Sequence, residues 1–154
     1  MKVLVVYDTV SPMKLTAKVA ETIGAVLNDK GIQVDSFYVK EVDKTIVKNY
    51  DCLVAGAPTM AFRASKDIKQ FLDSLPSRDF SGKLAAAFDT QIKSRFSGSA
   101  VKGIEDKLKK LGFRLVIAPL VVYVEGKTNK YHLKEGELEK TKKWAQTVAE
   151  TLSK

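Results

Sequence analysis

The chain has 154 residues, a length that suits one domain with a real core, and we expect residues 1–154 to form a single domain. Its apolar and charged fractions, 45% and 29%, are ordinary for a soluble globular protein. No apolar stretch approaches the roughly 20 residues that span a bilayer, and the N-terminal apolar run is too short for a secretion signal. We therefore expect a cytoplasmic protein with no membrane insertion.

The formal net charge is +8, and basic proteins attract nucleic acids, anionic membranes or acidic partners. The lysines are spread along predicted helices and do not form one block, so solvated helix faces explain them better than a nucleic-acid surface. Cys52 and His132 are each the only residue of their type. The chain therefore has no internal disulfide, and the single histidine argues against a histidine-based triad or metal site.

The first strand–turn–helix unit is the most informative segment. Lys2–Tyr7 is a short apolar run that predicts a fully buried strand, and the hydroxyl-bearing turn Asp8–Thr16 leads into an amphipathic helix. Ser11 is the predicted N-cap of this helix, with Pro12 as its first residue. A strand that feeds a helix in this way directs the free N–H groups of the helix to one spot, which favours an anion such as a phosphate.

The rest of the chain alternates between strands and helices. We expect a strand at Ile32–Val39, a short helix or turn at Val42–Asn49, a buried strand at Asp51–Ala57 closed by Pro58, and a helix at Ser65–Leu75. A buried strand at Lys83–Phe88 follows, then the polar loop Asp89–Gly98 and a helix at Ser99–Leu111. The chain ends with a last strand at Phe113–Val124 split at Pro119, a loop through Gly126 and His132, and a final helix that contains Trp144.

This alternation predicts the α/β fold class: a three-layer αβα sandwich around a doubly wound, five-stranded parallel sheet in the order 2-1-3-4-5. The topological switch point then lies between the first and third strands. Ligands of open sheets bind in the crevice at this point. We expect the loops Asp8–Thr16, Ala57–Ala64 and Asp89–Gly98 to meet there.

With these features the chain resembles a flavodoxin over essentially its whole length. The most specific match is Gly56-Ala-Pro-Thr59, followed by a helix that contains Phe71-Leu72, and the segments Phe88-Asp-Thr90 and Arg95-Phe-Ser-Gly-Ser99 are similar to the fourth-strand loop of small archaeal flavodoxin-like proteins. The resemblance implies that the chain binds FMN. It also implies that the first loop holds the FMN phosphate, while the second and third loops hold the isoalloxazine ring between them.

The first loop departs from the family pattern, because Pro12 stands where the family has a glycine and the loop is about two residues longer. Proline lacks an N–H group, so one phosphate donor is lost. In one interpretation this lost donor is replaced by the hydroxyls of Thr9, Ser11 and Thr16 and by the cation of Lys14. In the other, Ser11-Pro12 is only a good helix start on a scaffold that no longer binds FMN.

The ring site also differs from that of many flavodoxins, which stack the flavin between a tryptophan and a tyrosine. Trp144, the only tryptophan, belongs to the last helix, so the available apolar contacts are Met60, Phe62, Ile92 and Phe96, each of which is also a candidate for core packing. The full set of cofactor-binding residues that the resemblance implies is Thr9, Val10, Ser11, Met13, Lys14, Thr16, Pro58, Thr59, Met60, Ala61, Phe62, Asp89, Thr90, Gln91, Arg95 and Phe96.

The function that this resemblance implies is FMN-dependent electron transfer between redox partners. Cations in or beside the predicted site favour an acidic partner protein. Two alternatives stay open: a binding module that has lost FMN and holds another phosphorylated ligand or a protein, and an FMN-dependent reductase of quinones or porphyrin precursors. The sequence does not decide the oligomeric state.

Overall fold

The structure is a computed structural model that describes residues 1–9, 13–60, 63–76, 79–92, 99–127 and 130–154, with only the backbone of Met60 and Arg63. In chain order the elements are β1 (Lys2–Tyr7), α1 (Leu15–Asp29), β2 (Gln33–Tyr38), the 3-10 helix η1 (Lys44–Asn49), β3 (Cys52–Met60), β4 (Arg63–Ala64), α2 (Lys66–Ser74), β5 (Leu84–Ile92), α3 (Val101–Lys110), β6 (Arg114–Leu115), β7 (Leu120–Lys127), β8 (Lys130–Leu133) and α4 (Glu137–Leu152).

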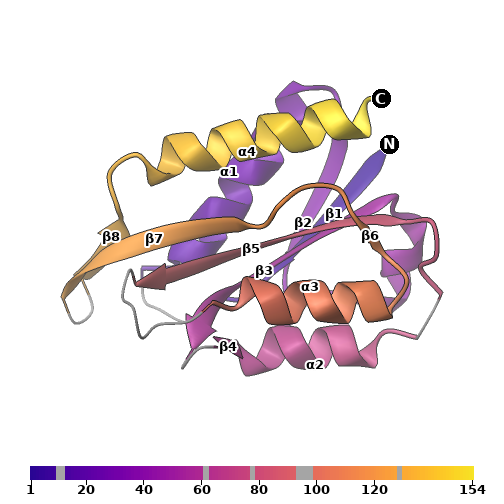
Figure 1. Ribbon diagram of the computed structural model, residues 1–154, viewed down its shortest axis with the longest axis horizontal. Coiled ribbons are helices and arrows are strands. Elements are labelled where there is room, and N and C mark those ends of the chain that lie inside the picture. The colour runs from indigo at the N-terminus through magenta and orange to yellow at the C-terminus, as the bar shows by residue number, and fades with distance from the viewer. Residues whose placement is uncertain (10–12, 61–62, 77–78, 93–98, 128–129) are drawn as a thin grey trace.

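The elements form three layers, with α1 and α4 on one face of the sheet and α2 and α3 on the other (Figure 1). Alternate residues of the central strands point to opposite faces, so Leu4 and Val6 pack with the α2–α3 layer while Val3 and Val5 pack with the α1–α4 layer. Strands covered on both faces read as continuous apolar runs, which is the pattern that the sequence shows.

The five central strands have the predicted order, because the main path of the sheet is β2-β1-β3-β5-β7 and these strands pair in parallel. The predicted number of strands was wrong: the described sheet has eight strands, not five. Two of the additional strands are short pieces, β4 antiparallel to β3 and β6 parallel to β5. The split of the last strand at Pro119 is confirmed, since β6 and β7 lie on either side of it.

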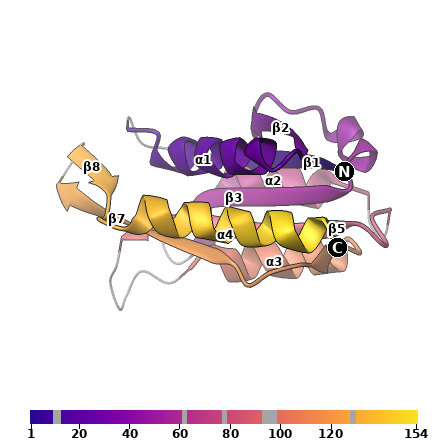
Figure 2. The same cartoon turned by 90° about the horizontal axis from the view of Figure 1, so that it is seen from above.

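The third additional strand corrects the prediction of a loop through Gly126 and His132. The chain folds back there, and β8 pairs antiparallel with the end of β7. The polar composition of this segment obscured the hairpin, because one face of an exposed ribbon carries charged residues. The hairpin extends beyond the body of the sheet (Figure 2).

Two strands run further than the sequence indicated. β3 continues through Pro58 to Met60, and β5 continues through Asp89 to Ile92. The carbonyl of Gly56 faces β1, because it accepts a hydrogen bond from the N–H of Asp8. Pro58, two residues further on, faces the same side, where β1 has already ended at Tyr7, so its missing N–H breaks no hydrogen bond between the two strands. The polar residues after Phe88 belong to the strand because neighbouring segments satisfy their side chains.

The first helix begins later than predicted. The prediction of Ser11 as N-cap and Pro12 as first helical residue was wrong, because α1 begins at Leu15 and its N-cap is Lys14. Residues 10–12 themselves lie outside the described residues. The start of α1 is therefore closer to Ala17, where the helix register of the family resumes in the sequence.

Candidate functional site

Hydrogen bonds between side chains join the three predicted loop regions at the carboxyl edge of the sheet. The hydroxyls of Thr16 in α1 and Thr90 in β5 lie 2.7 Å apart. The hydroxyl of Thr59 in β3 donates to Asp89 Oδ2 in β5 at 2.8 Å. The convergence of these regions at the switch point is thereby confirmed for their described residues.

Asp89 is the centre of the larger of these networks and is fully buried. Its Oδ2 accepts hydrogen bonds from Thr59 Oγ1, from Gln91 Nε2 at 2.8 Å, from Ser99 Oγ at 3.1 Å and from the N–H of Ala100 at 3.2 Å. Burial raises the pKa of the Asp89 carboxyl, and these donors oppose the shift in part. Among the described residues, Asp89 Oδ1 has no hydrogen-bond partner.

A second buried carboxylate, Asp8, lies where β1 ends. Its Oδ2 accepts a hydrogen bond of 2.5 Å from Ser65 Oγ, just before α2, and its Oδ1 accepts one of 2.8 Å from the N–H of Thr9. Asp8 thus ties the start of the first loop to the start of α2. The hydroxyl oxygen of Thr9 is buried and has no partner among the described residues. Within the described part of the chain it is therefore a buried polar group that no protein atom satisfies, at the start of the first loop.

The N-terminus of α1 lies at this edge, because Thr16 in its first turn contacts Thr90 of β5. Lys14 has left-handed backbone angles, φ 50° and ψ 45°, and it is the only non-glycine residue with positive φ among those described. No side chain caps the helix within the described part of the chain. The first-turn N–H groups and the exposed Lys14 ammonium therefore form the kind of positive group that favours an anion.

The structure accounts for part of the predicted site. Thr16, Thr90 and Gln91 are buried, as is Pro58, whereas Met13 is 45% exposed. Met60 ends β3, where its backbone pairs with that of Arg63. Six of the predicted residues lie outside the described ones: Val10, Ser11, Ala61, Phe62, Arg95 and Phe96.

Sequence reasoning missed three groups of this network: the hydroxyls of Ser65 and Ser99 and the N–H of Ala100. A signal existed for the two serines, because each is the first residue of a predicted helix, where a serine hydroxyl commonly binds a nearby polar group. Here each hydroxyl serves a buried carboxylate of a neighbouring strand. Their partners depend on strand pairing, which local sequence does not give.

The fold and the site define a class of protein: a doubly wound α/β domain whose sheet presents hydroxyls, a helix N-terminus and a cation at its carboxyl edge, where an anionic ligand fits. The sequence model of the flavodoxins matches residues 10–144, and the chain belongs to the flavodoxin family.

Solved flavodoxins have the same fold. One from the domain Archaea is 24% identical, with a TM-score of 0.82 and coverage of 100% of both chains. Oxidised flavodoxin 1 from Bacillus cereus is 22% identical, with a TM-score of 0.82 and coverage of 97% of this chain and 98% of that one. Rubredoxin oxygen:oxidoreductase from Desulfovibrio gigas is 21% identical over 99% of this chain but only 36% of its own, with a TM-score of 0.78. Curated protein sequences gave no match.

Flavodoxins bind FMN for electron transfer, and family membership gives FMN as the cofactor of this chain. The described residues fit the phosphate end of that cofactor, because the buried hydroxyl of Thr9 has no partner among them and Lys14 is the N-cap residue of α1. Lys14 also offsets the charge that a phosphate would bring. Within the described part of the chain, no helix is long and apolar enough to cross a bilayer.

Proposed function

We propose that this protein is a cytoplasmic electron carrier that takes electrons from one redox partner and delivers them to another through bound FMN. The observation that carries the proposal is the convergence of the three loop regions on one edge, where the Thr9 hydroxyl has no described partner. FMN supplies the redox chemistry, while the protein binds the cofactor, orients it and excludes water.

In this proposal the first loop holds the phosphate. Thr9 and Ser11 donate hydroxyl hydrogen bonds, Lys14 supplies positive charge, and Val10 and Met13 are the other phosphate-loop residues of the proposal. Thr16 has a different role: its hydroxyl contacts Thr90, so it fixes the start of α1 against β5 beside the phosphate site. In this proposal the hydroxyls of Thr9 and Ser11 and the charge of Lys14 offset the loss of the family glycine at Pro12.

The ring is held between the second and third regions in this proposal. Pro58, Thr59, Met60, Ala61 and Phe62 lie on one side, and Asp89, Thr90, Gln91, Arg95 and Phe96 on the other. Asp89 acts through its neighbours, because its buried Oδ2 holds the end of β3 and the start of α3 against β5. This rigid frame keeps the two ring-binding segments at a constant separation, which stabilises one bound geometry of the cofactor.

Charge near the site distinguishes this chain from acidic flavodoxins. Lys14, Lys66 and Arg95 belong to the segments around the site by sequence, and the net charge of the chain is +8. Positive charge stabilises an anionic reduced flavin, so we expect both reduction potentials to be less negative than those of acidic relatives. The same charge favours an acidic redox partner, with association that weakens as salt rises.

The direct test is the visible absorption spectrum of protein purified without added cofactor, followed by titration of the apoprotein with FMN monitored by flavin fluorescence. We expect flavin bands in the first measurement and quenching with micromolar or tighter affinity in the second. A colourless protein that leaves FMN fluorescence unchanged would overturn the proposal and favour a binding module for another ligand. Steady turnover of a quinone with NAD(P)H would instead favour a reductase.

A further inference from the structure

The β7–β8 hairpin has one charged face and one apolar face. Antiparallel pairing places Glu125 opposite His132 and Lys127 opposite Lys130, and these four residues share a face because side chains alternate along each strand. Val124, Tyr131 and Leu133 occupy the other face. Gly126 has φ 135°, and a Cβ there would overlap the backbone of Lys130, so the two strands approach closely at this point.

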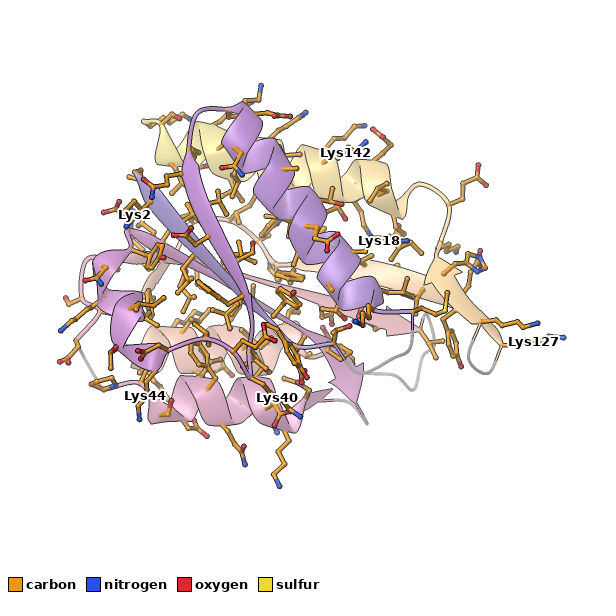
Figure 3. All side chains as sticks on the ribbon, turned by 180° about the vertical axis from the view of Figure 1, so that it is seen from behind. Lys2, Lys18, Lys40, Lys44, Lys127 and Lys142 are labelled. Carbon is orange, nitrogen blue, oxygen red and sulfur yellow. The ribbon has the colours of Figure 1, made fainter. Side chains whose placement is uncertain are left out.

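The opposed lysines are an unfavourable arrangement for an isolated protein. Like charges directly opposite each other on antiparallel strands are destabilising. Both side chains are exposed, and neither forms an ion pair with any of the described residues. Glu125, an acid on the same face, contacts His132 at 3.2 Å instead. Lys127 extends from the tip away from the rest of the protein (Figure 3). The pair thus presents two uncompensated positive charges to an approaching molecule.

A hollow lies at the base of the hairpin, where β7 pairs with the end of β5. It has a volume of about 430 Å³ and is lined by Ile92, Val124, Glu125, Gly126, Tyr131 and Lys134. Ile92 is the last residue of β5, it pairs with Val124, and its side chain is 50% exposed. Ile92 belongs to the third loop region, Asp89–Gly98, and directly follows Gln91, one of the proposed ring-binding residues. An apolar group seated in this hollow therefore lies at the same edge as the proposed ring site.

We propose that the β7–β8 hairpin and the hollow at its base form the docking surface for an acidic redox protein. Carboxylates of the partner pair with Lys127 and Lys130, and an apolar side chain of the partner enters the hollow beside Ile92. This proposal rests on the proposed function, because it names the partner chemistry and the place where electrons leave the bound FMN. In each encounter the reduced flavin loses one electron, and an oxidised metal centre of the partner gains it.

The test uses FMN-loaded protein, reduced photochemically and mixed in a stopped-flow instrument with oxidised rubredoxin, a small acidic one-electron acceptor, or with the basic acceptor cytochrome c. The variant is Lys127→Glu/Lys130→Glu. Its matched control is Lys44→Glu/Lys48→Glu, which makes the same change of net charge on η1, at the opposite end of the molecule (Figure 3). An ionic strength of about 10 mM keeps the Debye length near 30 Å.

We expect the hairpin variant to reduce rubredoxin about tenfold more slowly than the unmodified protein and cytochrome c faster, with less than about twofold change in the control. Equal effects in both variants would overturn the proposal, because they would reflect net charge alone. Unchanged rates in the hairpin variant would also overturn it. So would hairpin-dependent binding to phosphatidylserine vesicles or duplex DNA with unchanged rubredoxin rates, since the occupant would then be a membrane or a nucleic acid.

Two controls keep the result interpretable. The neutral variant Lys127→Gln/Lys130→Gln should show an intermediate rubredoxin rate, and it replaces the charge reversal if that variant does not fold. Failure of the proposed function is visible separately, because a chain that does not bind FMN lacks flavin absorbance before any kinetic measurement. In that case docking is measured by calorimetric titration of rubredoxin into the apoprotein and the hairpin variant, and equal affinities would overturn the docking proposal alone.

Discussion

Thr16 at the start of α1 and Thr90 near the end of β5 share a buried hydrogen bond, with 2.7 Å between their hydroxyl oxygens. They are 74 residues apart in the sequence, and their hydrogen bond joins the first helix to the third loop region. The start of α1 is thereby held against β5 at the edge where the cofactor is expected. This contact gives Thr16 a structural role beside the phosphate site.

We expect Thr16→Val to lower the free energy of unfolding by about 1–3 kcal/mol, because it leaves the Thr90 hydroxyl buried without its partner. Thr90→Val should act in the same way from the other side. The double variant should lose less than the sum of the two, since no hydroxyl is then left unpaired. Urea denaturation of the four proteins measures this cycle. Strictly additive losses would contradict the inferred coupling.

The buried Asp89 carboxyl should make stability depend on pH. Because burial raises its pKa in the folded state, its favourable contribution is present below the unfolded pKa of about 3.9 and is lost as the pH rises through the folded value. The stability of the unmodified protein should therefore fall relative to that of Asp89→Asn as the pH rises from about 4. Urea denaturation of both proteins from about pH 4, near the unfolded pKa of aspartate, to about pH 8 measures the difference in their free energies of unfolding. Parallel pH profiles of the two proteins would refute the predicted pH dependence.

Gly56 of β3 lies beside Phe88 of β5, and a Cβ at position 56 would overlap the ring. We expect Gly56→Ala to destabilise the fold by about 1–3 kcal/mol through overpacking. Adding Phe88→Leu should recover part of the loss, because the smaller side chain leaves room for the methyl group. Thermal unfolding of both single variants and the double variant checks this. If the double variant loses as much stability as the two single variants together, the overlap with the Phe88 ring does not cause the destabilisation by Gly56→Ala.

The single cysteine should be chemically inert in the folded state. Cys52 is 1% exposed, and burial raises the pKa of its thiol to about 12. Since the thiolate is the reactive form, iodoacetamide at about pH 8 should label Cys52 only after unfolding. The control is Cys52→Ala/Lys143→Cys, whose new thiol replaces an exposed lysine of α4 and should react readily in the folded protein. Rapid labelling of folded, unmodified protein would contradict the described burial.

A substitution of Lys14 tests the effect of its charge on FMN binding without a large change in the free energy of unfolding. Asparagine tolerates the left-handed backbone of this position, so Lys14→Asn should change the free energy of unfolding by less than about 0.5 kcal/mol. The loss of a charged contact to phosphate should nevertheless weaken FMN binding about tenfold or more. Fluorescence titration measures the affinity, with Lys44→Asn on the remote η1 as control. Equal FMN affinities in the two variants would show that Lys14 does not contribute to phosphate binding.

Short-range patterns were sufficient for much of the fold. The apolar runs Lys2–Tyr7 and Lys83–Phe88 predicted buried strands, and alternation with amphipathic helices predicted the order of the central sheet, because crossovers of parallel strands have one hand. The predicted position of the site at the switch point followed from that order. These features depend on periodicity and chain order alone. The single domain over residues 1–154 stays a prediction.

The tertiary structure decided what depends on neighbours distant in sequence. Polar residues such as Asp89 and Thr90 read as a loop, yet they continue β5 because Thr59, Ser99 and Thr16 satisfy their side chains. Similarly, the segment after Val124 reads as polar, and only its pairing with β7 makes it a hairpin. The sequence determined the order of the sheet through local apolar patterns. Strand ends, the buried polar network and the hairpin arose from contacts between separate segments, which local patterns do not contain.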